Sequence, residues 1–215
     1  RSFDRRMPEE INRIVTDRLS DRLFCPTRTA LDNLQAEGID GGVSLVGDVM
    51  LEATRMFASV AEEHMPLDRV TAHTPGTYAI ATVHRAGNTD DPDRLHAILA
   101  GLGRLGYPVL LPLHPRTRAR LGDRTIPDGL QVLPPQGYLA MMSLVANARR
   151  VLTDSGGLQK EAIWLGTPCV TLREETEWTE TLAGGWNRLA GADPERIERA
   201  ASAEPHGPAP SVGEV

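Results

Sequence analysis

The segment Leu152–Gly166 combines the residue types that would hold a phosphate group beside a sugar. Gly156 and Gly157 have no Cβ, so a turn at these residues lets backbone N–H groups approach a ligand closely. Ser155 adds a hydroxyl, and the helix predicted after it directs unpaired N–H groups and a positive dipole end at the same point. Glu161 lies almost two helical turns further on and could accept hydrogen bonds from a ribose diol. The segment predicts a diphosphate cradle with a ribose contact, or a simple helix N-cap before a glycine turn.

Four more candidate ligand-binding side chains follow apolar stretches that predict strands: His84, Arg85, His114 and Arg173. Ligands of parallel sheets bind at the carboxyl ends of the strands, so we expect these side chains to share one rim with Ser155. Each could also have a purely structural role. The histidines could order their own loops, Arg85 could be a surface charge, and Arg173 could pair with the acids that follow it.

A sheet must position these residues, and the chain alternates short apolar strands with helices. The expected strands are Val43–Val46, Tyr78–Val83, Val109–Leu113, Leu130–Leu133, Arg150–Thr153 and Pro168–Leu172. The expected helices are Met7–Leu23, Arg28–Glu37, Val49–Glu63, Asp91–Arg104, Gly137–Asn147, Gly157–Leu165 and Glu195–Ala203. This alternation predicts an α/β fold with a doubly wound, Rossmann-like parallel sheet.

Composition narrows the classes of partner. The chain has 215 residues and a formal net charge of −6, which argues against nucleic acid or an anionic membrane as a partner. It holds no apolar run of the roughly 18 residues that a membrane span needs. Cys25 and Cys169 are too few for a disulfide framework, and no Cys/His spacing suggests a zinc site. With no signal or transit segment at its start, the chain is expected to be cytoplasmic.

Seven strings in this order resemble the non-hydrolysing UDP-N-acetylglucosamine 2-epimerases, whose fold is of the two-domain glycosyltransferase-B type. They are MPEEINR from Met7, LFCPT from Leu23, GDVMLEA from Gly47, VHRAGN from Val83, LPLHPR from Leu111, LTDSGGLQKEA from Leu152 and LREETEW from Leu172. The resemblance implies the C-terminal half of that fold. Residues 1–46 would be a remnant of the first domain, 47–76 a connecting helix and linker, and 77–203 the UDP-binding domain, followed by a disordered tail over 204–215.

The resemblance also implies roles for individual residues. Ser155 and Gly156, with Gly157 beside them, would hold phosphate. Glu161 would hold ribose, and the loop around Tyr138 would approach the uracil. His84 would lie near the diphosphate.

Three further roles come from the same resemblance. Glu9 would be one of the active-site acids, although it could simply favour the helix dipole. Arg85 and His114 correspond to residues that bind a second, activating UDP-sugar in bacterial members. Lys160 stands where an acid is common in the family.

The implied reaction interconverts UDP-N-acetylglucosamine (UDP-GlcNAc) and UDP-N-acetylmannosamine (UDP-ManNAc) by elimination and re-addition of UDP through a 2-acetamidoglucal. It requires neither a metal nor a nicotinamide cofactor, it would serve surface polysaccharide assembly, and the full-length parent would be a homodimer. The strings Glu175–Trp178 and Gly185–Asn187 resemble a branch that acts on UDP-diacetamido-uronic acids. Three further interpretations are a hydrolysing relative, a UDP-sugar glycosyltransferase of the same fold, and an inactive nucleotide-binding fragment. Because residues 1–46 would expose apolar surface, we expect low stability or self-association.

Overall fold

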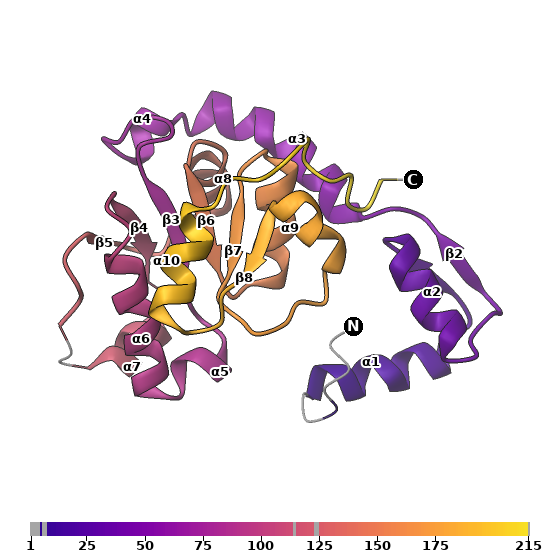
Figure 1. Ribbon diagram of the computed structural model, residues 1–215. Coiled ribbons are helices and arrows are strands. Elements are labelled where there is room, and N and C mark those ends of the chain that lie inside the picture. Colours follow the sequence, from indigo (N-terminus) through magenta and orange to yellow (C-terminus); the bar gives the residue numbers. More distant parts are fainter. Residues whose placement is uncertain (1–4, 6–7, 114, 123–124, 215) are drawn as a thin grey trace.

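The computed structural model describes residue 5 and residues 8–113, 115–122 and 125–214. A large α/β unit and a small N-terminal unit lie side by side (Figure 1). The large unit contains a six-stranded, wholly parallel sheet in the order β5-β4-β3-β6-β7-β8. Its strands are β3 (Ala79–Thr82), β4 (Val109–Pro112), β5 (Leu130–Leu133), β6 (Arg150–Thr153), β7 (Cys169–Thr171) and β8 (Asn187–Leu189). This is the doubly wound order of Rossmann folds, which the strand and helix pattern predicted.

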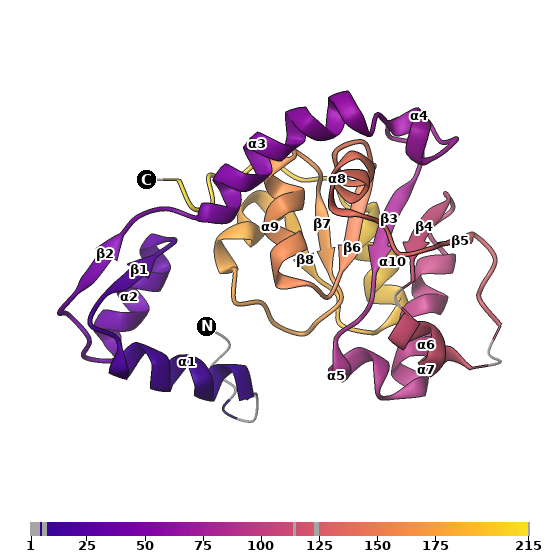
Figure 2. The ribbon, with the colours of Figure 1, turned by 180° about the vertical axis from the view of Figure 1, so that it is seen from behind.

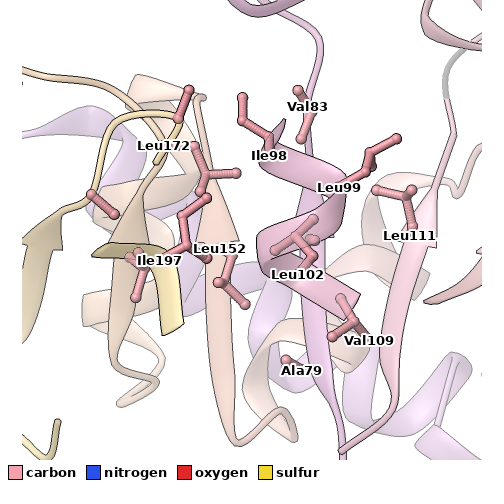
Figure 3. Packing of buried hydrophobic residues seen from close by; sticks show 14 of the residues in the cluster. Ala79, Val83, Ile98, Leu99, Leu102, Val109, Leu111, Leu152, Leu172 and Ile197 are labelled. Carbon is pink, nitrogen blue, oxygen red and sulfur yellow. The ribbon is translucent and has the colours of Figure 1, made fainter. Parts of the chain in front are cut away.

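Alternation along β3 explains why both faces of the sheet are covered. Ala79 and Ala81 face one core, whereas Tyr78 and Ile80 face the other, as the two-residue period of a strand requires. In the first core, Ile98 and Leu102 pack against the sheet (Figure 3). The helices of that core are α6 (Pro92–Gly103), α7 (Pro115–Leu121) and α10 (Pro194–Ser202). The second core is covered by α4 (Leu67–Val70), α8 (Tyr138–Ala146) and α9 (Gly156–Trp164).

Helix α3 (Val49–His64) crosses the large unit and packs on α8 and α9 (Figure 1). Asp48 is its N-cap, and the Asp48 Oδ1 atom accepts a 2.9 Å hydrogen bond from the backbone N–H of Met50. This cap fixes the residue at which α3 begins, next to α9. The same place is where the chain leaves the small unit.

The small N-terminal unit comprises α1 (Pro8–Leu19), β1 (Leu23–Cys25), α2 (Arg28–Ala36) and β2 (Val43–Leu45). Its two strands are parallel, and it stands beside the large unit in both views (Figure 2). Ile11, Val15 and Leu19 recur every four residues on α1 and are exposed, Leu19 to 80%. Such a stripe is normally buried against a partner surface, and its exposure matches the expectation that residues 1–46 expose apolar surface.

The C-terminal segment differs from the sequence expectation of a disordered tail over 204–215. The described residues to 214 pack on the large unit, with Val212 almost fully buried. The indole N–H groups of Trp164 and Trp186 donate to the carbonyls of Val212 and Gly207, at 2.9 and 3.2 Å. A Pro- and Gly-rich segment cannot form a core of its own, but indole donors on a neighbouring surface can hold it in an extended path.

Further local differences have simple causes. Leu23 was expected on the first helix and lies in β1, because that helix ends at Leu19. Phe24, in the same strand, is 66% exposed. The short α5 (Ala86–Thr89), the 3₁₀ segment η1 (Thr179–Gly185) and the polar edge strand β8 show too little periodicity to be predicted. No described helix has the length and apolar character needed to cross a membrane.

Candidate functional site

The strand order reverses between β3 and β6, and a crevice opens at their carboxyl ends. Helix α9 begins at this crevice, where the Ser155 Oγ atom caps it by accepting a 3.4 Å hydrogen bond from Leu158 N–H. Ser155 is therefore a helix N-cap. The same geometry still directs the first N–H groups of α9, at Gly156 and Gly157, toward the crevice.

A cavity of about 670 Å³ occupies the crevice. Its lining brings together residues from the ends of β3 and β4 and from α3, α8 and α9. Among them are Met50, Thr82, His84, Pro112, Tyr138, Met141, Ser155, Gly157 and Glu161. A hydroxyl, a carboxylate and an aromatic ring on a mostly apolar wall can contact the ribose and base of a nucleoside, and the N–H groups at the start of α9 can contact a phosphate.

Glu161 and Tyr138 form the polar end of this cavity. Tyr138 Oη donates to Glu161 Oε1 at 3.3 Å, and the Phe57 and Tyr138 rings form a T-shaped pair with their centroids 5.7 Å apart. Burial raises the pKa of Glu161 above its usual value, which the hydrogen bond from Tyr138 and the charge of Lys160 only partly offset. A diol that donates to this carboxylate would relieve its loss of hydration.

Asp154, one residue before the helix cap, anchors the loop that carries His84 and Arg85. Its carboxylate is fully buried and accepts hydrogen bonds from the backbone N–H groups of both residues, the one from Arg85 at 2.9 Å. Asn88 Nδ2 donates to Asp154 Oδ2 at 3.1 Å, and His84 Nδ1 lies 3.3 Å from Oδ1. One carboxylate thus joins the loop after β3 to the loop after β6.

Glu177 lies over the start of α9. A Cβ built on Gly156 would be only 2.6 Å from Glu177 Oε1. Arg173 Nη1 donates to Glu177 Oε2 at 2.8 Å, and Arg85 Nη2 donates to Oε1 at 3.4 Å. Burial raises the pKa of Glu177, but a backbone hydrogen bond and the charge of Arg173 outweigh burial, so the pKa lies below its usual value. An ionised carboxylate therefore lies between two guanidinium groups and a helix N-terminus.

A second cavity of about 330 Å³ adjoins the first and includes Lys160, Glu177 and Trp178 in its lining. Lys160 is buried, pairs with Asp48, and has its ammonium 3.7 Å from the centroid of the Trp178 ring. The pair joins α9 to the cap of α3. It keeps α3 so close that a Cβ on Gly157 would lie 3.3 Å from Met50 Cε.

Seven of the residues singled out from the sequence line these two cavities: His84, Arg85, Tyr138, Ser155, Gly156, Gly157 and Glu161. Arg173 reaches the site through its ion pair with Glu177. Glu9 is an exposed residue of α1 in the small unit, and the described lining residues do not include it. His114 falls outside the described residues. Among those described, no three His, Cys, Asp or Glu side chains gather as a metal ion would require.

Sequence reasoning missed Asp154, Glu177 and Lys160 as members of the site. Asp154 was not singled out from the sequence, although its place directly after a buried strand puts it on the rim. Lys160 gave no comparable signal, because its position depends on a contact with Asp48, which is distant in sequence. For Glu177, the pairing with Arg173 was an open alternative that the structure shows, but its place over the start of α9 was not predicted.

Comparison with known proteins identifies the same family throughout the chain. A family model described as UDP-N-acetylglucosamine 2-epimerase matches residues 1–206. The UDP-2,3-diacetamido-2,3-dideoxy-D-glucuronate 2-epimerase of Pseudomonas aeruginosa is 48% identical over 207 residues, which are 94% of this chain and 57% of that protein. A UDP-N-acetylglucosamine 2-epimerase of Methanococcus maripaludis is 40% identical over 212 residues, again covering 57% of its length.

Solved structures agree with the sequence matches. The Methanocaldococcus jannaschii UDP-GlcNAc 2-epimerase, crystallised with UDP-GlcNAc and UDP, superposes with a TM-score of 0.88 at 36% identity. The alignment covers 98% of this chain and 62% of that one. The Neisseria meningitidis enzyme bound to UDP-GlcNAc gives a TM-score of 0.75 at 28% identity, over 93% and 58% of the two chains. These similarities confirm the expected glycosyltransferase-B type fold, and the chain spans about half the length of the curated relatives it matches.

Proposed function

The chain belongs to the UDP-N-acetylglucosamine 2-epimerase family, and we propose that its crevice is the nucleotide-binding part of an epimerase that interconverts UDP-GlcNAc and UDP-ManNAc. One observation carries the proposal. Helix α9 starts at the point where the strand order reverses, and it presents Gly156 and Gly157 at its N-terminus and Glu161 deeper along the cavity. That layout suits a diphosphate followed by a ribose.

The nucleotide is proposed to lie along α9. The diphosphate binds at Ser155, Gly156 and Gly157, with the guanidinium groups of Arg85 and Arg173 within reach of it. The ribose hydroxyls donate to Glu161, a carboxylate that burial leaves short of hydrogen bonds.

The Tyr138 ring supports the uracil. It is 45% exposed at the mouth of the cavity, and the Phe57 ring holds its orientation. An aromatic face of this kind offers apolar contact to a base without fixing its identity.

The reaction itself proceeds by elimination and re-addition. A base removes the proton at C2, the C1–oxygen bond breaks, and the electron pair of that bond leaves on UDP. UDP then adds back to C1 of the bound glycal while a proton returns to the opposite face of C2. His84 and Arg85, at the diphosphate end of the cavity, stabilise the negative charge that develops on the departing group. Glu9 remains our candidate for one of the active-site acids.

The sugar has a second candidate. The relative from Pseudomonas aeruginosa is named for a UDP-diacetamido-glucuronate, which carries a carboxylate on the sugar. The strings Glu175–Trp178 and Gly185–Asn187, which resemble that branch, support this second candidate. A glycosyltransferase of the same fold would differ from both by requiring an acceptor.

The wider setting is also proposed. The products would feed surface polysaccharide assembly, and the full-length protein would act as a homodimer. Two buried, unpaired cysteines, Cys25 and Cys169, support a reducing cytoplasmic location.

A proton NMR time course in deuterated water tests the proposal. With UDP-GlcNAc and no acceptor, the C2 proton signal should disappear as solvent deuterium replaces it and the manno isomer should accumulate. The diacetamido-uronate should be run in parallel, and faster exchange there would assign the second sugar. An unchanged C2 proton with both sugars, without broadening of the UDP resonances by protein, would contradict both the reaction and the binding site.

A further inference from the structure

The Asp154 carboxylate has more neighbours than a loop anchor needs. Its Oδ2 atom accepts hydrogen bonds from Arg85 N–H at 2.9 Å, from His84 N–H at 3.1 Å and from Asn88 Nδ2 at 3.1 Å. Its Oδ1 atom faces the ring of His84, with Nδ1 at 3.3 Å and the His84 backbone N–H at 3.2 Å. Oδ2 therefore holds the loop, while Oδ1 is the atom that meets the imidazole.

Burial makes this contact selective for one form of histidine. The Asp154 side chain is completely buried, so its charge is unstable unless every lone pair faces a donor. An ionised carboxylate can only accept hydrogen bonds, and a neutral imidazole carries a proton on one of its two nitrogens. A proton on His84 Nδ1 can be donated to Asp154 Oδ1. If the proton were on Nε2 instead, the lone pair of Nδ1 would face a lone pair of Oδ1, which is repulsive.

The second ring nitrogen is then left for the ligand. The His84 side chain is 49% exposed and lines both cavities of the crevice. Because Nδ1 lies 3.3 Å from Asp154 Oδ1, Nε2 is the ring nitrogen left for a ligand. A group that acts on the departing diphosphate has to present this atom in one orientation.

We propose that Asp154 is a positioning residue that holds His84 as the Nδ1–H tautomer and thereby presents Nε2 to the diphosphate of the nucleotide. The identity of the ligand in this proposal rests on the proposed function. The tautomer of His84 does not, because it depends only on the contact with Asp154. When Nε2 takes up a proton, the imidazolium lies between the Asp154 carboxylate and the phosphate oxygens. Nε2–H can then donate to the departing UDP, and Asp154 neutralises the positive charge that the ring gains.

The rival explanation is that Asp154 only fixes the backbone of the loop. Asn88 separates the two roles, because its amide binds Asp154 Oδ2 and the Leu172 carbonyl but does not contact the imidazole. Asn88→Ala removes part of the loop anchor and leaves Oδ1 facing the ring. Asp154→Asn removes the charge and places an amide group among donors that it cannot all satisfy.

The test is a long-range proton–nitrogen NMR correlation on protein labelled with ¹⁵N-histidine, with His84 assigned from the signals lost in His84→Gln. In the wild-type chain at a pH where the ring is neutral, the Nδ1–H form should exceed the Nε2–H form by roughly tenfold. Asp154→Asn should shift the ratio toward Nε2–H, which predominates in free histidine, and Asn88→Ala should retain Nδ1–H.

Two results would overturn the proposal. One is a wild-type His84 that is mainly Nε2–H, which needs no variant to be interpreted. The second is an Nδ1–H preference that survives in a folded Asp154→Asn chain. Adding UDP to the same wild-type sample tests the binding site separately. A wild-type spectrum in which no histidine signal responds to UDP would count against the proposed function and leave the tautomer result standing.

Discussion

Removing the charge of Glu177 should strengthen the binding of UDP. Glu177 lies over the start of α9, where a Cβ built on Gly156 would be only 2.6 Å from its Oε1 atom, and it pairs with Arg173 and Arg85. A diphosphate at the N-terminus of α9 needs that space and those two guanidinium groups. We therefore expect Glu177 to act as a competing anion that bound UDP displaces.

The size of the effect follows from the ion pair with Arg173. Its donor and acceptor are 2.8 Å apart, and the two side chains are only 10% and 22% exposed. A hydrogen bond to a charged group contributes about 1.5–3 kcal/mol, and partial exposure of Glu177 favours the lower value. Glu177→Gln should therefore tighten UDP binding by about 1.5 kcal/mol, which is roughly tenfold in Kd.

Isothermal titration with UDP, pyrophosphate and uridine measures this effect. Glu177→Gln should improve UDP and pyrophosphate binding to a similar degree and leave uridine unchanged, because uridine has no phosphate. Glu175→Gln is the matched control, since Glu175 is exposed and shows no hydrogen bond or ion pair in the described part of the chain. Weaker UDP binding in Glu177→Gln would refute the reasoning and mean that Glu177 holds Arg173 in its binding position.

Four further predictions concern different parts of the molecule. Ser155→Ala should weaken UDP binding by about 1–2 kcal/mol in the same titration, and unchanged affinity would leave Ser155 as a helix cap only. Glu161→Gln should weaken uridine nucleotides but not pyrophosphate. It should also raise the thermal midpoint at neutral pH, because a raised pKa means that the ionised form destabilises the fold. That gain should vanish below the usual glutamate pKa, where Glu161 is protonated in both the folded and the unfolded chain. A gain in thermal midpoint that persists at such a pH would contradict this prediction. Val212→Ala should lower the free energy of unfolding by about 2 kcal/mol in urea titrations, because Val212 is almost fully buried. An unchanged free energy of unfolding would mean that the C-terminal segment does not pack on the large unit. Leu19→Glu should reduce self-association measured by sedimentation, and an unaltered distribution would exclude the α1 stripe as its cause.

The sheet and its helices were predictable because periodicity and local signals agree. Five of the six strands in the large sheet lie within stretches expected from apolar pattern, and caps such as Asp48 and Ser155 mark helix starts that the structure retains. Right-handed crossover connections then limit the possible strand orders, and the structure shows which of them is adopted. The predictions failed where contact decides the conformation, as for the C-terminal segment, which depends on Trp164 and Trp186.

The site was predictable in part for the same reason. Ser155, Gly156 and Glu161 belong to one strand–turn–helix segment, so spacing alone places them together. The ion pair of Glu177 with Arg173 was among the alternatives that the sequence left open, and the structure shows it. The contacts of Glu177 with Arg85 and of Lys160 with Asp48 could not be predicted, because Arg85 and Asp48 approach from elements that are distant in sequence. Asp154 is an intermediate case: its position on the rim follows from the strand before it, but its three hydrogen-bond donors come from the residues after β3.

A crystal structure of this chain with saturating UDP tests the central claim most directly. The account predicts phosphate oxygens within hydrogen-bond distance of the Gly156 and Gly157 N–H groups, and ribose hydroxyls on Glu161. It also predicts that Glu177 has left its position over the start of α9. UDP bound at another place, or an empty crevice at saturation, would contradict the claim that the N-terminus of α9 is the diphosphate site.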